Sequence, residues 1–197
     1  MAAPFFLAAL DLSGRACVVF GGGDEAERRV RELSEHGAVL TLVTPAPGPA
    51  LTALALSSDT LVLHEREPAL TDLDGVFLAV LADRNPAWVA MFGPAARARQ
   101  LLFCAIDQPE FNSFAHVGVA RAGVLQLGVS TSGRVPGVAG AIRKLLQTLL
   151  DDSRFECIVE KVQEVRESAP VSARSARVRA LAAKIRLEGR LFLDDED

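Results

Sequence analysis

Apolar and polar positions along the first half of the chain predict short strands that alternate with helices. Apolar runs bounded by turn residues predict five buried strands, at 16–20, 38–43, 60–64, 75–82 and 101–106. After the first run, Ala26, Val30 and Leu33 recur at helical spacing, and the charged positions 28, 29, 31 and 32 lie mostly off that face. This alternation predicts a doubly wound parallel α/β sheet.

A further helix is predicted from Pro86 to Gln100, with a break or kink at Gly93-Pro94 because proline lacks the N–H that a helix needs. Beyond residue 113 the pattern changes. Two short strands are predicted at 117–119 and 124–129, around a turn at 121–123. Three helical stretches follow, the first with an apolar face and the others near 152–167 and 173–188; the apolar face consists of Ala141, Ile142, Leu145, Leu146 and Leu149.

Three successive glycines stand between the first strand and the first helix. Gly21, Gly23 and Ala26 satisfy the G-x-G-x-x-G/A pattern of a dinucleotide-binding βαβ unit. Gly21 allows a tight turn, and the missing Cβ of Gly23 lets a diphosphate approach the backbone at the positive end of the helix. We interpret the site as nucleotide-binding; the alternative is a plain strand–helix turn.

Composition excludes several kinds of chemistry. The chain has no tyrosine, which excludes a Tyr/Lys reductase mechanism, and no P-loop pattern, which excludes a P-loop NTPase. His36, His64 and His116 lack metal-ligand spacing, so we interpret them as surface or boundary residues. A net charge of −4 predicts neither nucleic-acid nor membrane binding.

The N-terminus and the cysteines bear on the compartment. The apolar N-terminus lacks the basic region of a secretory signal. The three cysteines are widely spaced among apolar neighbours, which predicts buried thiols and a cytoplasmic location.

Candidate ligand-binding residues follow the predicted strands. Ligands of such sheets bind beyond the carboxyl ends of the strands. In this chain those ends carry Gly21–Glu25, Thr44–Ala46, Asp83–Asn85 and Asp107. We therefore expect the cofactor to contact Gly21, Gly22, Gly23, Asp24, Glu25, Thr44, Pro45, Ala46 and Asp83.

The residues after the second strand favour NAD over NADP. No Lys or Arg occurs from Thr44 to His64, so a ribose 2′-phosphate would find no nearby cation. No carboxylate follows the strand either, which leaves backbone groups or the Thr44 hydroxyl for the ribose. Two alternatives stay open for the acidic pair at 24–25: Asp24 caps the helix and forms a D-x-x-E box with Glu27, or the pair contacts the adenosine hydroxyls.

From about Pro4 to Leu150 the chain resembles the precorrin-2 dehydrogenase/sirohydrochlorin ferrochelatase family, the N-terminal module of siroheme synthase. Four segments carry the resemblance in order: 12–29 with the glycine motif, 37–45, Ile106-Asp107-Gln108-Pro109 with Ser113-Phe114, and 123–133 with Pro136 and 141–143.

The resemblance implies NAD-dependent oxidation of precorrin-2 to sirohydrochlorin in a homodimer, with insertion of ferrous or cobaltous ion by some members. It implies a Rossmann domain at 1–112, a dimerisation region at 113–150 and a helical C-terminal domain at 151–197. Asp107 matches the functional aspartate, as catalytic base and transient metal ligand. Ser130, Thr131 and Arg134 are candidate substrate-binding residues, and Thr131 matches a serine that is phosphorylated in some members. The alternative is that Ser130, Thr131 and Ser132 cap the helix that begins near Val135.

The chain also departs from the family pattern at the nucleotide edge. Glu25 replaces a common valine, Asp83-Arg84-Asn85 replaces Thr-Asp-Asp, and Cys104 and Val117 replace an asparagine and a proline. Two other hypotheses therefore remain: a non-enzymatic or chelatase-only module that binds a tetrapyrrole or nucleotide, and a different NAD-dependent oxidoreductase. The basic stretch 174–190 is either a surface for the substrate's carboxylates or a solvated helix face.

Overall fold

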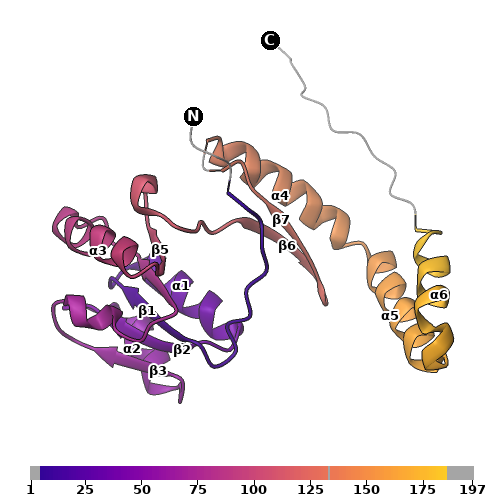
Figure 1. Ribbon diagram of the computed structural model, residues 1–197, viewed down its shortest axis with the longest axis horizontal. Helices are drawn as coiled ribbons and strands as arrows, with labels where there is room; N and C mark the ends of the chain where they lie inside the picture. Colours follow the sequence, from indigo (N-terminus) through magenta and orange to yellow (C-terminus); the bar gives the residue numbers. More distant parts are fainter. Residues whose placement is uncertain (1–4, 133, 186–197) are drawn as a thin grey trace, which may run out of the picture. The chain divides into compact units, whose positions relative to one another are not determined.

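The computed structural model describes residues 5–132 and 134–185, which form two compact units (Figure 1). The first unit runs to Val117 and includes Ser130–Pro136. The second contains Gly118–Val129 and the chain from Gly137 onward. No helix within the described residues is long and apolar enough to cross a membrane.

A five-stranded parallel sheet forms the centre of the first unit. Its strands are β1 (Ala16–Phe20), β2 (Val39–Val43), β3 (Leu61–His64), β4 (Leu78–Leu81) and β5 (Leu102–Ala105). They lie in the order β3-β2-β1-β4-β5, with Val18 of β1 paired with Thr41 of β2 and Ala79 of β4. This is the strand order of the Rossmann fold, so the predicted fold class is confirmed. The reversal of order between β1 and β4 creates the crevice where ligands of such sheets bind.

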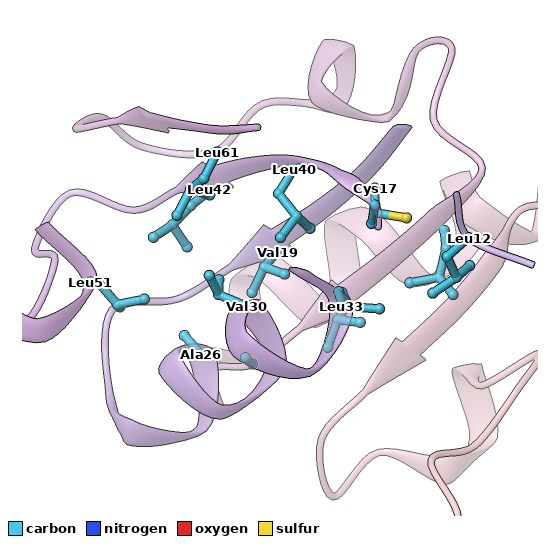
Figure 2. Close-up of a cluster of buried hydrophobic side chains, with 14 residues drawn as sticks. Leu12, Cys17, Val19, Ala26, Val30, Leu33, Leu40, Leu42, Leu51 and Leu61 are labelled. Atoms are coloured by element: carbon cyan, nitrogen blue, oxygen red, sulfur yellow. The ribbon is translucent and has the colours of Figure 1, made fainter. Parts of the chain in front are cut away.

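Helices cover both faces of this sheet. The connecting elements are α1 (Asp24–Glu35), α2 (Pro49–Leu56), η1 (Leu70–Leu73), α3 (Pro86–Ala98) and η2 (Pro109–Phe111). Ala26, Val30 and Leu33 of α1 are buried against strand residues such as Val19 and Leu42 (Figure 2), which confirms the predicted apolar face. The helix α2 was not predicted, although Pro49 stands at its first turn, a common position for proline.

On the opposite face α3 packs through Trp88, Val89 and Phe92. Phe92 stacks on Phe20 of β1 with 4.2 Å between ring centroids. Burial of each such side chain contributes about 1.5–3 kcal/mol. The strand residues on this face alternate with those facing α1, as the two-residue period of a strand requires.

Of the predicted break or kink at Gly93-Pro94, the break is wrong, because α3 continues through Pro94 to Ala98; the kink stays a prediction. Proline removes the hydrogen bond to the carbonyl four residues earlier, here that of Ala90. Ala90 is exposed, so water can satisfy its carbonyl group. Gly93 is required for packing instead: a Cβ there would lie 2.3 Å from Cδ1 of Phe111.

The outer edge of β5 is covered by residues just after η2. The Ser113 hydroxyl accepts a hydrogen bond from the Phe103 N–H at 2.8 Å and donates to the Leu101 carbonyl at 2.8 Å. Asn112 Oδ1 accepts from the Ala105 N–H at 2.7 Å. Two polar side chains thus satisfy backbone groups that a sixth strand would otherwise bind.

The second unit begins with an antiparallel hairpin of β6 (Gly118–Ala122) and β7 (Leu125–Val129). Ala122 pairs with Leu125, so the turn is Gly123-Val124 and not 121–123 as predicted. Gly123 has φ +53°, which suits the first position of a two-residue type II′ turn.

The helix α4 (Pro136–Leu150) holds this hairpin through the Gln147 amide. Its Oε1 accepts from the Arg121 N–H and its Nε2 donates to the Arg121 carbonyl, both at 2.9 Å. Leu145 and Leu149, on the predicted apolar face, are exposed within the single chain. The helices α5 (Ser153–Ser168) and α6 (Val171–Ala182) follow and pack on each other. The short link between them includes the buried Ala169.

Candidate functional site

The carboxyl ends of the parallel strands bring the predicted cofactor residues to one edge of the sheet. The glycine turn follows β1, and Thr44–Ala46 follows β2. Asp83 follows β4, and Asp107 follows β5. This edge of the first unit is therefore the candidate ligand-binding site.

The glycine turn is fixed by its contacts with the loop after β2. Gly21 has φ +128°, a conformation that favours glycine, and its N–H bonds to the Val43 carbonyl at 3.3 Å. A Cβ on Gly22 would lie 2.0 Å from the Ala46 carbonyl oxygen. The Gly22 carbonyl in turn accepts from the Gly48 N–H at 2.9 Å. Gly21 and Gly22 are thus required by the fold itself.

Gly23 differs from the other two because it faces open space. A Cβ on Gly23 would meet no atom within 4 Å. It is the N-cap of α1, and the first bond of the helix runs from the Glu27 N–H to its carbonyl. The N–H groups of the first turn therefore project from the helix end beside this open position. The position fits a diphosphate of a dinucleotide, which such a helix end favours.

The capping alternative for Asp24 is wrong. Gly23 occupies the N-cap position without a side-chain cap, so Asp24 is the first helical residue. Glu27 forms no capping box but accepts a 2.8 Å hydrogen bond from Nε of Arg31 on the outer surface of α1. Asp24 is exposed, and contact with the adenosine hydroxyls stays a prediction.

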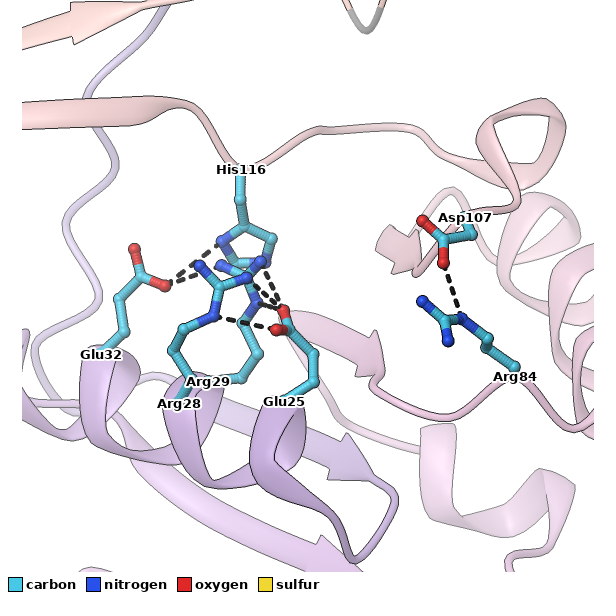
Figure 3. A network of polar contacts seen from close by, with 7 residues as sticks. All are labelled: Glu25, Arg28, Arg29, Glu32, Arg84, Asp107 and His116. Atoms are coloured by element: carbon cyan, nitrogen blue, oxygen red, sulfur yellow. Dashed lines mark hydrogen bonds and ion pairs between the residues drawn. The ribbon is translucent and has the colours of Figure 1, made fainter. Parts of the chain in front are cut away.

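The Glu25 side chain forms ion pairs with two arginines of the next turn of α1 (Figure 3). It accepts hydrogen bonds from Nε of Arg28 at 2.9 Å and from Nε of Arg29 at 2.8 Å. Arg29 also reaches Glu32 at 2.8 Å. Burial raises the pKa of Glu25, but hydrogen bonds and charge from Arg28 and Arg29 outweigh it and hold that pKa below its usual value.

Arg29 is only 7% exposed, which corrects the expectation that it lies off the buried face. His116 lies against the same cluster, with Nδ1 3.6 Å from Glu32 Oε2, and its side chain is 15% exposed. Its Nε2 is buried and makes no hydrogen bond within the described residues. Burial and the charge of Arg29 lower the pKa of His116 to about 4, so it is neutral near pH 7. This residue, interpreted from sequence as an ordinary histidine, is therefore part of a charged network.

The residues after β2 shape the site in different ways. Thr44 is buried, and its hydroxyl accepts from the Ala46 N–H at 3.3 Å, so it fixes the loop beside the glycine turn. Pro45 and Ala46 are exposed at the edge. Contact of these three residues with a ribose stays a prediction.

The residues after β4 join the glycine turn to the end of β5. A Cβ on Gly21 would lie 3.4 Å from the Asp83 Cβ, so Asp83 borders the turn. Asp83 accepts from the Asn85 N–H at 2.8 Å, and Asn85 caps α3 by accepting from the Ala87 N–H at 3.0 Å. Between them Arg84 projects outward to Asp107. Arg84 lies in the segment 83–85 that was predicted at this edge, but its bond with Asp107 was not predicted, because it depends on the fold.

Asp107 occupies the turn that ends β5 with φ +58°, a left-handed conformation that Asp and Asn tolerate better than most residues. The Gln108 N–H closes the turn on the Ala105 carbonyl at 3.4 Å. The carboxylate is 60% exposed and accepts a 2.7 Å hydrogen bond from Nε of Arg84 (Figure 3). An exposed carboxylate at this edge can accept a proton from a ligand that lies over the sheet.

The predicted substrate-binding residues lie in a polar turn after β7. The Ser130 hydroxyl accepts from the Ser132 N–H at 3.1 Å. The Thr131 hydroxyl accepts from the Val135 N–H at 3.3 Å, just before α4. Arg134 is exposed, with its N–H bonded to the Thr131 carbonyl at 3.1 Å. Their contact with a substrate stays a prediction.

Other predicted chemical features are distributed more widely. Cys17 and Cys104 are buried thiols, whereas Cys157 is exposed, contrary to expectation. Within the described residues no three His, Cys, Asp or Glu side chains gather as a metal site. Of the basic stretch, Arg174 lines a cavity of about 210 Å³ with Arg166 of α5, and residues 186–190 lie outside the described part.

The sheet order and the open glycine turn define a Rossmann-type dinucleotide-binding unit. A family model described as "Putative NAD(P)-binding" matches residues 8–117, more than half of the chain, and the chain belongs to that family.

Comparison with individual proteins supports the predicted resemblance, which is confirmed. Siroheme synthase of Photobacterium profundum is 34% identical over 141 residues, 71% of this chain and 30% of that protein. Siroheme synthase of Escherichia coli is 34% identical over 139 residues, with the same coverage of 71% and 30%. The chain thus matches about 30% of the length of these relatives.

A solved structure of SirC, a precorrin-2 dehydrogenase, has the same fold. It superposes with a TM-score of 0.76 at 24% sequence identity, over 92% of this chain and 90% of that one.

Proposed function

We propose that this chain catalyses NAD-dependent dehydrogenation of precorrin-2 to sirohydrochlorin, a step of siroheme biosynthesis. The observation that carries the proposal is an exposed carboxylate, Asp107, at the edge of the sheet that also presents the open glycine turn. The 34% identity to siroheme synthases over 141 residues supports the choice of substrate.

Asp107 is the proposed general base. Dehydrogenation removes a hydride and a proton from the substrate, and bound NAD supplies the hydride acceptor. The Asp107 carboxylate takes the proton. Arg84 orients this carboxylate through the 2.7 Å hydrogen bond, and the short turn on which Asp107 lies keeps the group directed outward at the end of β5.

The proposed cofactor is NAD rather than NADP. Gly23 and the first turn of α1 would hold the diphosphate, and the Thr44–Ala46 loop would hold the adenosine ribose. No Lys or Arg from Thr44 to His64 is available for a 2′-phosphate.

The proposed assembly is a homodimer formed through the region 113–150. Five large apolar side chains among the described residues there are exposed in the single chain: Val124, Val135, Val138, Leu145 and Leu149. Apolar side chains gathered in one region commonly mark a protein interface. We also place the protein in the cytoplasm, since its three free thiols suit a reducing compartment.

Insertion of ferrous or cobaltous ion into sirohydrochlorin is a second proposed activity of the same site. The metal is then a substrate, and Asp107 would accept the pyrrole protons or hold the ion transiently. The exposure of Asp107 favours this, because a flat macrocycle and an ion both need access to it.

An absorbance assay tests these activities in sequence. Precorrin-2 and NAD are mixed with the protein, and formation of sirohydrochlorin and NADH is followed; ferrous or cobaltous ion is then added. Turnover with NAD and none without it is the expected result. Metal insertion into added sirohydrochlorin, without NAD-dependent oxidation of precorrin-2, would favour the chelatase-only alternative. Tetrapyrrole binding without either reaction would favour the non-enzymatic module.

A further inference from the structure

Glu25 has two properties with opposite effects on a bound diphosphate: its position at the start of a helix and its negative charge. It is the second residue of α1, in the first turn, where the helix end attracts anions. Its own carboxylate would repel a diphosphate there. Asp24 and Glu27 share this turn, but neither bonds to more than one cation in the described structure.

Both carboxylate oxygens of Glu25 are engaged by guanidinium groups that reach back from the next turn (Figure 3). Arg28 donates through Nε and Nη2, and Arg29 donates through Nε. These contacts hold two positive charges at the first turn of the helix. Because the guanidinium groups pair with Glu25, they do not pair with a ligand.

The charges of the cluster balance. Glu25 and Glu32 face Arg28 and Arg29, and His116 beside them is neutral near pH 7. Arg29 is buried and keeps Glu32 as a partner whatever happens at position 25. The Arg28 side chain is 62% exposed and is free to reorient if Glu25 releases it.

We propose that Glu25 sets the affinity of the site for dinucleotides by withholding Arg28 from the diphosphate. This inference rests on the proposed dinucleotide binding. Neutralising Glu25 converts an uncharged cluster into one with a net positive charge beside the helix end, and releases Arg28 toward the phosphates. Glu25 thus acts as an affinity-determining residue that weakens cofactor binding.

The chain offers a matched control on the same helix. Glu27→Gln removes the same charge from the same turn, but Glu27 pairs with Arg31 on the outer surface. Of the two variants, only Glu25→Gln releases Arg28 from its carboxylate partner. Any effect of helix-end charge as such is shared by both variants.

Isothermal titration calorimetry with NAD and with ADP-ribose tests the proposal without any turnover. Glu25→Gln is expected to lower the Kd by about 3- to 10-fold at low salt, and Glu27→Gln by less than about twofold. The gain should shrink as ionic strength rises, because it is electrostatic. Arg28→Gln should weaken binding, and the Glu25→Gln/Arg28→Gln double variant should return close to wild type.

Three results would overturn the inference. One is an unchanged or higher Kd in Glu25→Gln, and another is an equal gain in Glu27→Gln. The third is unchanged binding in Arg28→Gln, a variant that leaves Glu25 in place. Failure of the proposed function is distinct from these: wild type and every variant would then bind neither NAD nor ADP-ribose.

Discussion

Arg84 donates a hydrogen bond from Nε to Oδ2 of Asp107 at 2.7 Å, and this bond joins the loops after the two adjacent strands β4 and β5. Both side chains are exposed, so the pair adds at most about 1 kcal/mol to stability. Its effect is on geometry: it limits the directions in which the Asp107 carboxylate can point.

Asp107→Asn tests the proposed base with least disturbance of the fold. Asparagine tolerates the left-handed conformation of this turn and keeps an oxygen for Arg84, but it cannot accept the proton. Sirohydrochlorin formation is expected to fall by at least about 100-fold, with the Kd for NAD within a few-fold of wild type. Full activity in the absorbance assay would reject Asp107 as the catalytic group.

Arg84→Gln tests the positioning role of the arginine. Loss of the bond should leave Asp107 chemically intact but less restrained, so kcat is expected to fall by about 3- to 30-fold with the unfolding free energy changed by less than about 1 kcal/mol. Arg84→Lys should recover part of kcat, since Lys can still donate. Equal kcat values for wild type and Arg84→Gln would count against positioning.

The glycine turn separates structural from ligand-binding requirements at neighbouring positions. Gly22→Ala forces a Cβ against the Ala46 carbonyl and should cost about 1–3 kcal/mol of stability in urea unfolding. Gly23→Ala meets open space and should cost less than about 1 kcal/mol, yet its methyl group would occupy the diphosphate position. A Kd for NAD that rises at least tenfold in Gly23→Ala is the expected result; an unchanged Kd would place the diphosphate elsewhere.

These regions also show how far the sequence determines the structure. The strand positions follow from short apolar runs, because a parallel strand buried on both faces has almost no polar residues. The predicted ends differ from the observed ones by up to three residues, as with β4, which begins at Leu78 and not at 75. The fold class and the glycine turn were predictable for this reason.

Contacts between distant segments were not predictable. Arg29 is buried because Glu25, Glu32 and the segment around His116 surround it, and helical spacing alone places it outside the apolar face. Asp24 matches a cap in sequence, but the turn held by Gly48 makes Gly23 the cap instead. The Arg84–Asp107 bond spans 23 positions and depends on the β4–β5 pairing.

His116 should make stability depend on pH. Its pKa is about 4 in the folded chain against an ordinary 6.5, so the unfolded chain binds more protons between these values. The folded chain is therefore most stable above about pH 6.5, where His116 is neutral in both states, and it loses stability as the pH falls toward 4. The unfolding free energy is expected to drop by about 2 kcal/mol from pH 7 to pH 5.

His116→Met should remove most of this drop in urea unfolding, because methionine does not titrate. Glu25 changes stability in the same direction but only below its usual pKa near 4.5, so it does not obscure the comparison at pH 5. The same pH dependence in both proteins would assign the effect to another group.

Leu145→Glu tests the proposed homodimer. The Leu145 side chain is 58% exposed within the chain, so a charge there should spare the fold but disrupt an apolar interface. Light scattering is expected to give a dimer for wild type and a monomer for the variant. Ser172→Glu, an exposed site on α6, serves as control and should stay dimeric. A monomeric wild type would contradict the proposal.

The side chains that cover β5 have a consequence for the behaviour of the protein at high concentration. Unprotected edge strands recruit strands of other molecules and so promote polymerisation into fibrils. Asn112 and Ser113 already bind the N–H groups of Ala105 and Phe103, so an incoming strand would have to displace bonds of 2.7 and 2.8 Å. Asn112 and Ser113 thereby make the β5 edge of the sheet resistant to strand-by-strand polymerisation.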